Sequence, residues 1–218
     1  MPDIILPGSA GRIEARYQRQ KNPGAPMALV LHPHPQFGGT MNNPLVYDLF
    51  HMFHGLGCTT VRFNFRGVGR SQGSFDNGAG ELSDAAAVLD WMNTLYPNPS
   101  NVWVCGISFG AWIGMQLLMR RPEITGFVSI APPASMYDFA FLAPCPASGL
   151  IVHGTKDNVV PEPDVQKLVD RLTAQKGIKI TYNKIDGANH FFDKHEADVV
   201  ETVKTYVSDM MSKPREGR

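Results

Sequence analysis

Short apolar runs alternate with helical patterns along this chain from residue 27 to its end. Between the runs, apolar side chains recur at helical spacing, as Leu45, Leu49 and Phe53 do. Continuous apolar runs are typical of strands that are covered on both faces. The alternation predicts an α/β fold, a mainly parallel sheet with helices on both faces. The strand-like runs span residues 27–33, 59–65, 101–108, 126–133, 148–154 and 179–185.

The N-terminal segment follows a different pattern. Residues 3–20 contain two strand-like stretches around the turn PGSAG, and Ile13, Ala15 and Tyr17 alternate with polar neighbours. This pattern predicts an antiparallel hairpin, which brings the expected sheet to about eight strands. Because no repeat or linker interrupts the chain, we expect a single domain over residues 1–218, with a frayed tail at 213–218.

Charge and cysteine content exclude several classes of function. The chain has 218 residues, and its 20 basic and 20 acidic side chains cancel. It therefore has no overall field to attract nucleic acid or an anionic membrane, and we expect neither as a partner. Three widely spaced cysteines indicate neither a disulfide framework nor a zinc site. No secretory leader pattern or membrane-length apolar run is present, so we expect a cytoplasmic, soluble protein.

The stretch VWVCGISFGAWIGMQLLM at residues 102–119 carries the main chemical signal. It reads as a strand, a Gly-x-Ser-x-Gly turn at Gly106, Ser108 and Gly110, and a helix that begins at once. This layout is typical of a nucleophile elbow, in which a sharp turn exposes the serine hydroxyl. A second match, centred on Ser71, leads into a polar glycine-rich loop instead. The helix directly after Ser108 therefore favours Ser108 as the nucleophile.

A serine nucleophile needs an imidazole to take its proton and a carboxylate to orient that imidazole. Asp157 and His190 follow Ser108 along the chain, and each begins the loop after a different predicted strand. Asp186 is a rival acid, but it lies in the same loop as His190. Two simpler roles stay open, since His190 could cap the last helix and Asp157 could be a turn residue.

Five segments together resemble the α/β hydrolases, in particular the small lidless group related to dienelactone hydrolases and compact bacterial esterases. This resemblance implies an α/β-hydrolase fold without a cap domain. It implies Ser108 as nucleophile, Asp157 as acid and His190 as base, and it implies no cofactor. The segments that carry the resemblance are LVLHPHPQFGGTMNN, FNFRGVGRSQG, CGISFGA, HGTKDNVVP and GANHFF.

An oxyanion hole needs two backbone N–H groups. Phe109, directly after the nucleophile, is expected to supply one. The second is expected from the loop after residues 27–33, where Pro35 has no N–H, so His34 or Gln36 must donate. The resemblance favours His34. A set of apolar residues could line an acyl pocket or pack in the core: Phe37, Met136, Tyr137, Phe139 and Phe141.

These observations predict a serine hydrolase that cleaves a small or medium acyl ester or thioester of a small molecule. A peptidase or aminopeptidase of the same fold is the alternative enzyme, and a non-catalytic binding module is the alternative of another class. No metal site is expected, because the pairs His32/His34 and His51/His54 have no third ligand at suitable spacing. The aromatic residues within 135–147 make a homodimer plausible.

Overall fold

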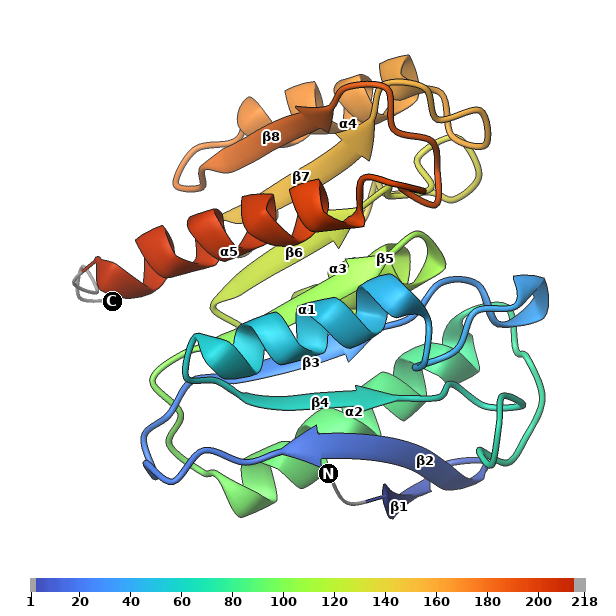
Figure 1. Cartoon of the computed structure of the whole chain (residues 1–218), viewed down its shortest axis with the longest axis vertical. Helices are drawn as coiled ribbons and strands as arrows, with labels where there is room; N and C mark the ends of the chain where they lie inside the picture. The colour runs from blue at the N-terminus through green and yellow to red at the C-terminus, as the bar shows by residue number, and fades with distance from the viewer. Residues whose placement is uncertain (1–2, 214–218) are drawn as a thin grey trace.

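In the computed structural model, which describes residues 3–213, eight strands form one sheet in the order β1-β2-β4-β3-β5-β6-β7-β8 (Figure 1). The prediction of a mainly parallel sheet with an antiparallel N-terminal hairpin is confirmed. Apart from Lys213, the predicted frayed tail lies outside the described residues. The strands are β1 Asp3–Gly8, β2 Gly11–Gln18, β3 Met27–Leu31, β4 Thr59–Phe63, β5 Val102–Ile107, β6 Gly126–Ile130, β7 Gly149–Gly154 and β8 Ile180–Ile185.

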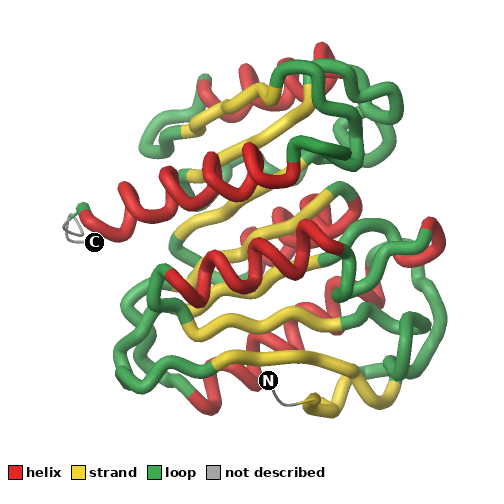
Figure 2. Tube along the Cα trace, viewed as in Figure 1, coloured by secondary structure: helices red, strands yellow, loops and turns green. Residues whose placement is uncertain are grey.

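Five α-helices cover the two faces of this sheet within the described chain (Figure 2). Helices α1 and α5 pack on one face, and α2, α3 and α4 pack on the other. The central strands therefore bury both sets of side chains. In β3, Leu29 faces one core and Val30 faces the other. The helices are α1 Pro44–Gly55, α2 Ala79–Leu95, α3 Phe109–Arg120, α4 Glu162–Thr173 and α5 Glu196–Ser212.

The parallel strands β3 to β8 all end at the same edge of the sheet (Figure 1). In such sheets ligands bind in loops beyond these carboxyl ends. The connection from β6 to β7, residues 131–148, contains no helix or strand. No cap domain is inserted there, which leaves the edge open. Among the described helices, none is both long and apolar enough to cross a membrane.

Several element boundaries differ by one to three residues from the sequence-based expectation, and two of the differences have a local cause. Strand β3 ends at Leu31 rather than at residue 33, because Pro33 cannot donate to a strand ladder. Helix α2 begins at Ala79, before Leu82, the first residue of its apolar helical pattern. The reason is a capping interaction, in which the Glu81 carboxylate accepts hydrogen bonds from the N–H groups of Asp76 and Gly78.

Candidate active site

A strained turn places Ser108 between β5 and α3. Its backbone is at φ 52° and ψ −117°, a conformation that residues other than glycine rarely adopt. A Cβ at position 106 would collide with the backbone of residue 110, and one at position 110 would collide with the carbonyl of His32. The two glycines of the motif are therefore required by close backbone approach. This geometry is that of a nucleophile elbow.

Ser108, His190 and Asp157 come together in one hydrogen-bonded chain, although they lie on three separate loops. The hydroxyl of Ser108 is 3.0 Å from Nε2 of His190, and Nδ1 of His190 is 2.7 Å from Oδ2 of Asp157. Because an ionised carboxylate only accepts hydrogen bonds, Nδ1 carries the proton and donates it. Nε2 is then free to accept the Ser108 hydroxyl proton.

Backbone groups hold the Asp157 carboxylate in place. The N–H groups of Val159 and Val160 each donate to its Oδ1 at 2.8 Å. Burial by itself raises the pKa of Asp157, but the hydrogen bonds from His190 and from these N–H groups outweigh it. The pKa of Asp157 therefore lies below its ordinary value, and the carboxylate is ionised at neutral pH.

His153 on β7 supports the same loop, and the sequence did not single it out. Its ring is completely buried, and Nε2 donates to the carbonyl of Val160 at 3.0 Å. The same nitrogen lies 3.6 Å from Oδ2 of Asp157. Burial lowers the pKa of His153, so its ring is neutral at neutral pH. The available signal was a histidine in an otherwise apolar strand, four residues before Asp157.

The backbone N–H groups of Phe109 and His34 donate to no hydrogen-bond acceptor among the described residues. The rings of these two residues are in contact, with centroids 4.8 Å apart. The N–H of Gln36, the alternative donor, is already used, because it donates to Nδ1 of His34 at 3.2 Å. The geometry therefore favours His34 over Gln36 as the second oxyanion donor.

Comparison with known proteins places the chain in a family. Residues 10–148 match the family model described as X-Pro dipeptidyl-peptidase (S15 family), a member of the α/β-hydrolase clan. That match covers more than half of the chain, including the elbow. The chain belongs to the S15 family of α/β hydrolases. The match ends before Asp157 and His190, so it does not bear on the acid and the base of this hydrolase.

Solved α/β hydrolases match the chain over more than nine-tenths of its length. An Agrobacterium tumefaciens protein of unknown function, assigned to the alpha/beta hydrolases, is 58% identical with a TM-score of 0.95, and the match covers 96% of each chain. An alpha-beta serine hydrolase homologue from Coxiella burnetii is 35% identical with a TM-score of 0.86, over 94% of this chain and 97% of that one. A serine hydrolase without lid from Xanthomonas campestris is 30% identical with a TM-score of 0.87, over 98% and 96%.

The rival residues of this hydrolase have other partners. The Ser71 hydroxyl is buried, accepts from the N–H of Glu14 at 2.9 Å and donates to the carbonyl of Asn64 at 2.6 Å. It therefore joins two backbone segments. Asp186 accepts from the hydroxyl of Thr155 at 3.0 Å. Among the described contacts neither residue meets His190.

We expect Ser71→Ala to destabilise the hydrolase by about 1–3 kcal/mol, because it leaves the buried N–H of Glu14 without a partner. Urea denaturation measures this change. Ser83→Ala is the matched control: its exposed hydroxyl donates only to the helical carbonyl of Ala79, so the change should stay within about 0.5 kcal/mol. Equal stability of the two variants would contradict the structural role of Ser71.

Aromatic rings form a continuous group beside the elbow. The ring of Tyr137 stacks on Trp112 with centroids 4.3 Å apart and also contacts Phe109. The ring of His34 contacts Phe37 at 4.7 Å and Phe75 at 4.9 Å. Trp112 and Phe75 were not expected at the site. Trp112 lies on α3, four residues after Ser108, and Phe75 comes from the loop before α2, and no motif distinguishes either ring. We call these six rings, with His34 included, the aromatic group.

The predicted pocket residues therefore divide into two sets. Phe37, Met136 and Tyr137 lie at or beside the aromatic group, and Phe37 and Met136 are exposed. For Phe139 the core alternative holds, because it is only 2% exposed and belongs to the core under α2, α3 and α4. Phe141 is half-buried and packs against the same core, with its ring stacked on Phe139.

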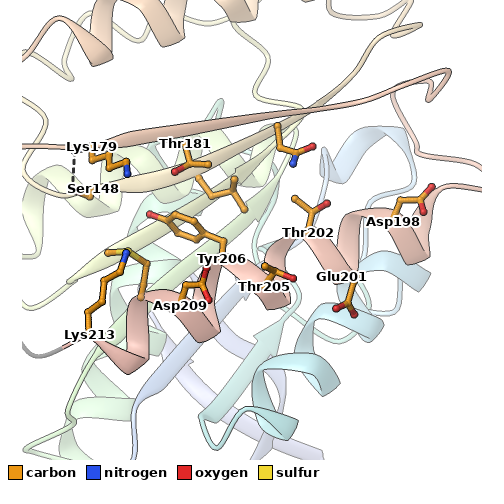
Figure 3. Close-up of a pocket in the computed structure, with 13 residues that line it drawn as sticks. Ser148, Lys179, Thr181, Asp198, Glu201, Thr202, Thr205, Tyr206, Asp209 and Lys213 are labelled. Carbon is orange, nitrogen blue, oxygen red and sulfur yellow. Dashed lines mark hydrogen bonds between the residues drawn. The ribbon is translucent and has the colours of Figure 1, made fainter.

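A separate cavity of about 700 Å³ lies between α5 and the strands β7 and β8 (Figure 3). Tyr206 lies in its middle, and burial raises the pKa of this tyrosine to about 12. No lining residue comes from the loops that carry Ser108, Asp157 or His190, so the cavity is distinct from the serine site. Its labelled lining residues are Ser148, Lys179, Thr181, Asp198, Glu201, Thr202, Thr205, Tyr206, Asp209 and Lys213.

Proposed function

We propose that this protein is a serine hydrolase that cleaves small or medium acyl esters or thioesters through an acyl-enzyme intermediate. The observation that carries the proposal is the hydrogen-bonded chain from the Ser108 hydroxyl through His190 to Asp157. A serine hydroxyl becomes nucleophilic when an oriented neutral imidazole can take its proton. The hydrogen bond between His190 and Asp157 is buried, and the one between Ser108 and His190 is partly buried.

Each step uses a group already in place. Nε2 of His190 takes the Ser108 proton as Oγ attacks the acyl carbon, and Asp157 stabilises the imidazolium. The N–H groups of Phe109 and His34 hold the developing oxyanion, and one such donor contributes roughly 3–4 kcal/mol. His190 then gives its proton to the leaving oxygen or sulfur. In the second half, His190 activates water, which releases the acid and restores Ser108.

Peptidase action is the second candidate, because the matching family model is described as an X-Pro dipeptidyl-peptidase. An exopeptidase of that kind grips a protonated amino terminus, for which a free carboxylate at the site is suited. The carboxylate of Glu81 interacts electrostatically with His34 and Tyr137 at the site. It is fully buried, and its oxygens accept from the N–H groups of Asp76 and Gly78. Because these hydrogen bonds occupy its oxygens, Glu81 is not available to bind an amino terminus, which favours ester or thioester substrates.

The remaining expectations are part of the same proposal. A non-catalytic binding module would have no need of an aligned proton-transfer chain, so we favour the enzyme. The three cysteines are free and buried, which suits a reducing compartment such as the cytoplasm. Homodimerisation through the segment 135–147 stays a prediction, and sedimentation of the purified protein would measure it.

A fluorophosphonate probe and a substrate panel test the proposed function. We expect stoichiometric labelling of the wild type and faster turnover of p-nitrophenyl butyrate and of a butyryl thioester than of aminoacyl p-nitroanilides. Fluorophosphonates report an activated serine whichever acyl bond the enzyme cleaves. An unlabelled, folded protein would contradict the enzyme proposal. A labelled protein that turns over only the anilides would instead favour the peptidase.

A further inference from the structure

The two consecutive phenylalanines that follow His190 have opposite environments. Phe192 is completely buried, whereas Phe191 is 63% exposed. Phe192 has a backbone φ of 57°, in the left-handed region that aromatic residues rarely adopt. Strain of this kind persists only where surrounding structure imposes it, and it is concentrated at functional sites. Here burial of Phe192 turns the preceding ring outward.

Side-chain hydrogen bonds fix the same turn. Oδ1 of Asn189 accepts from the N–H groups of Phe191 and Asp193, each at 3.1 Å. Nδ2 of Asn189 donates to the Asp193 carboxylate at 2.9 Å. The exposed ring of Phe191 thus lies on a turn that three hydrogen bonds of the Asn189 side chain hold in place. It stands edge-on to the ring of His190, with centroids 5.4 Å apart.

The proposed chemistry determines which part of a substrate would meet this ring. His190 must deliver its proton from Nε2 to the leaving oxygen or sulfur, so the leaving group lies beside His190. The carbonyl oxygen points instead toward the N–H groups of Phe109 and His34. Phe37, which is 79% exposed and contacts the ring of His34, belongs to that second side. The two exposed phenylalanines therefore flank different parts of the substrate.

We propose that Phe191 is a specificity-determining residue that contacts an apolar leaving group, the alcohol or thiol part of the substrate. This inference rests on the proposed function of Ser108, His190 and Asp157. A single exposed phenylalanine is ordinary on a protein surface. The braced, strained turn and the contact with His190 give this one a specific position. The aromatic group, with Phe37 at its edge, contacts the acyl part.

Two ester series separate the two halves of the substrate. In the first series the acyl group is butyryl and the alcohol is ethanol or hexanol, which have nearly the same acidity, so the intrinsic chemistry is matched. In the second the alcohol is ethanol and the acyl group is acetyl or hexanoyl. Hydrolysis is followed by proton release for the wild type, Phe191→Ser and Phe37→Ser. Both side chains are exposed, so both variants should fold, and thermal denaturation checks this.

We expect Phe191→Ser to lower the hexyl-to-ethyl ratio of kcat/KM on the order of tenfold and to leave the hexanoyl-to-acetyl ratio unchanged. Phe37→Ser should leave the hexyl-to-ethyl ratio unchanged, and Phe191→Leu should retain most of the wild-type ratio because it keeps an apolar contact. An unchanged hexyl-to-ethyl ratio in Phe191→Ser, or an equal fall of this ratio in Phe37→Ser, would overturn the assignment of Phe191. If the wild type is still labelled by the fluorophosphonate, the proposed function would stand. A wild-type protein that the fluorophosphonate does not label would overturn the proposed function as well.

Discussion

Replacing Ser108 by alanine is expected to lower kcat for ester hydrolysis by about 10⁶-fold and to abolish labelling by a fluorophosphonate. In the proposed mechanism the Ser108 hydroxyl forms the acyl-enzyme, and neither His190 nor the oxyanion N–H groups can replace it. Those groups still bind and polarise the ester, which leaves a residual rate about 10³-fold above that in water. The KM for a p-nitrophenyl ester should change little. Burst-phase kinetics and mass spectrometry of the labelled protein measure these effects.

The loss is expected without unfolding, because the Ser108 hydroxyl contacts only His190 among the described hydrogen bonds. Ser71→Ala is the matched control, since it removes the other hydroxyl that sits in a Gly-x-Ser-x-Gly pattern. It should weaken the fold and keep the labelling. Labelling that survives Ser108→Ala but is lost in Ser71→Ala would refute the choice of nucleophile.

Much of the fold follows from local sequence signals. Buried parallel strands read as continuous apolar runs, and the helices between them show their period directly, so the order and type of the elements could be predicted. The ends of elements depend on contacts that periodicity does not contain. Helix α2 starts early because Glu81 caps it, and this capping involves a loop residue, Asp76.

The candidate site could be predicted only where residue type and chain order carry the signal. Ser108, Asp157 and His190 each begin a loop after a strand, and a mainly parallel sheet brings such loops to one edge. Contacts between distant segments carry no such signal. Phe75 reaches the site through the contacts of its ring with His34 and Phe109. Likewise, nothing in the sequence distinguishes the exposed Phe191 from the buried Phe192.

Asp157→Asn is the second change with a large expected effect, a loss in kcat of about 10⁴-fold with the fold retained. The N–H groups of Val159 and Val160 both require an acceptor, so the asparagine must direct its amide oxygen to them. Its NH₂ group then occupies the position of Oδ2, facing Nδ1 of His190. Because NH₂ only donates, Nδ1 must lose its proton and Nε2 must carry it. A protonated Nε2 cannot accept the Ser108 proton, so the nucleophile is not activated.

Asp186→Asn provides the comparison, because Asp186 lies in the His190 loop but bonds to the Thr155 hydroxyl. An amide oxygen can accept that bond as well as a carboxylate can, so kcat should stay within about twofold of the wild type. The two variants thus distinguish Asp157, whose carboxylate sets the tautomer of His190, from Asp186, whose carboxylate only bonds to the Thr155 hydroxyl. Similar losses in both would mean that negative charge near His190, rather than the fixed proton on Nδ1, drives activation. A loss confined to Asp157→Asn would assign the effect to the carboxylate of residue 157, which the two N–H groups orient so that its other oxygen accepts the proton on Nδ1 of His190.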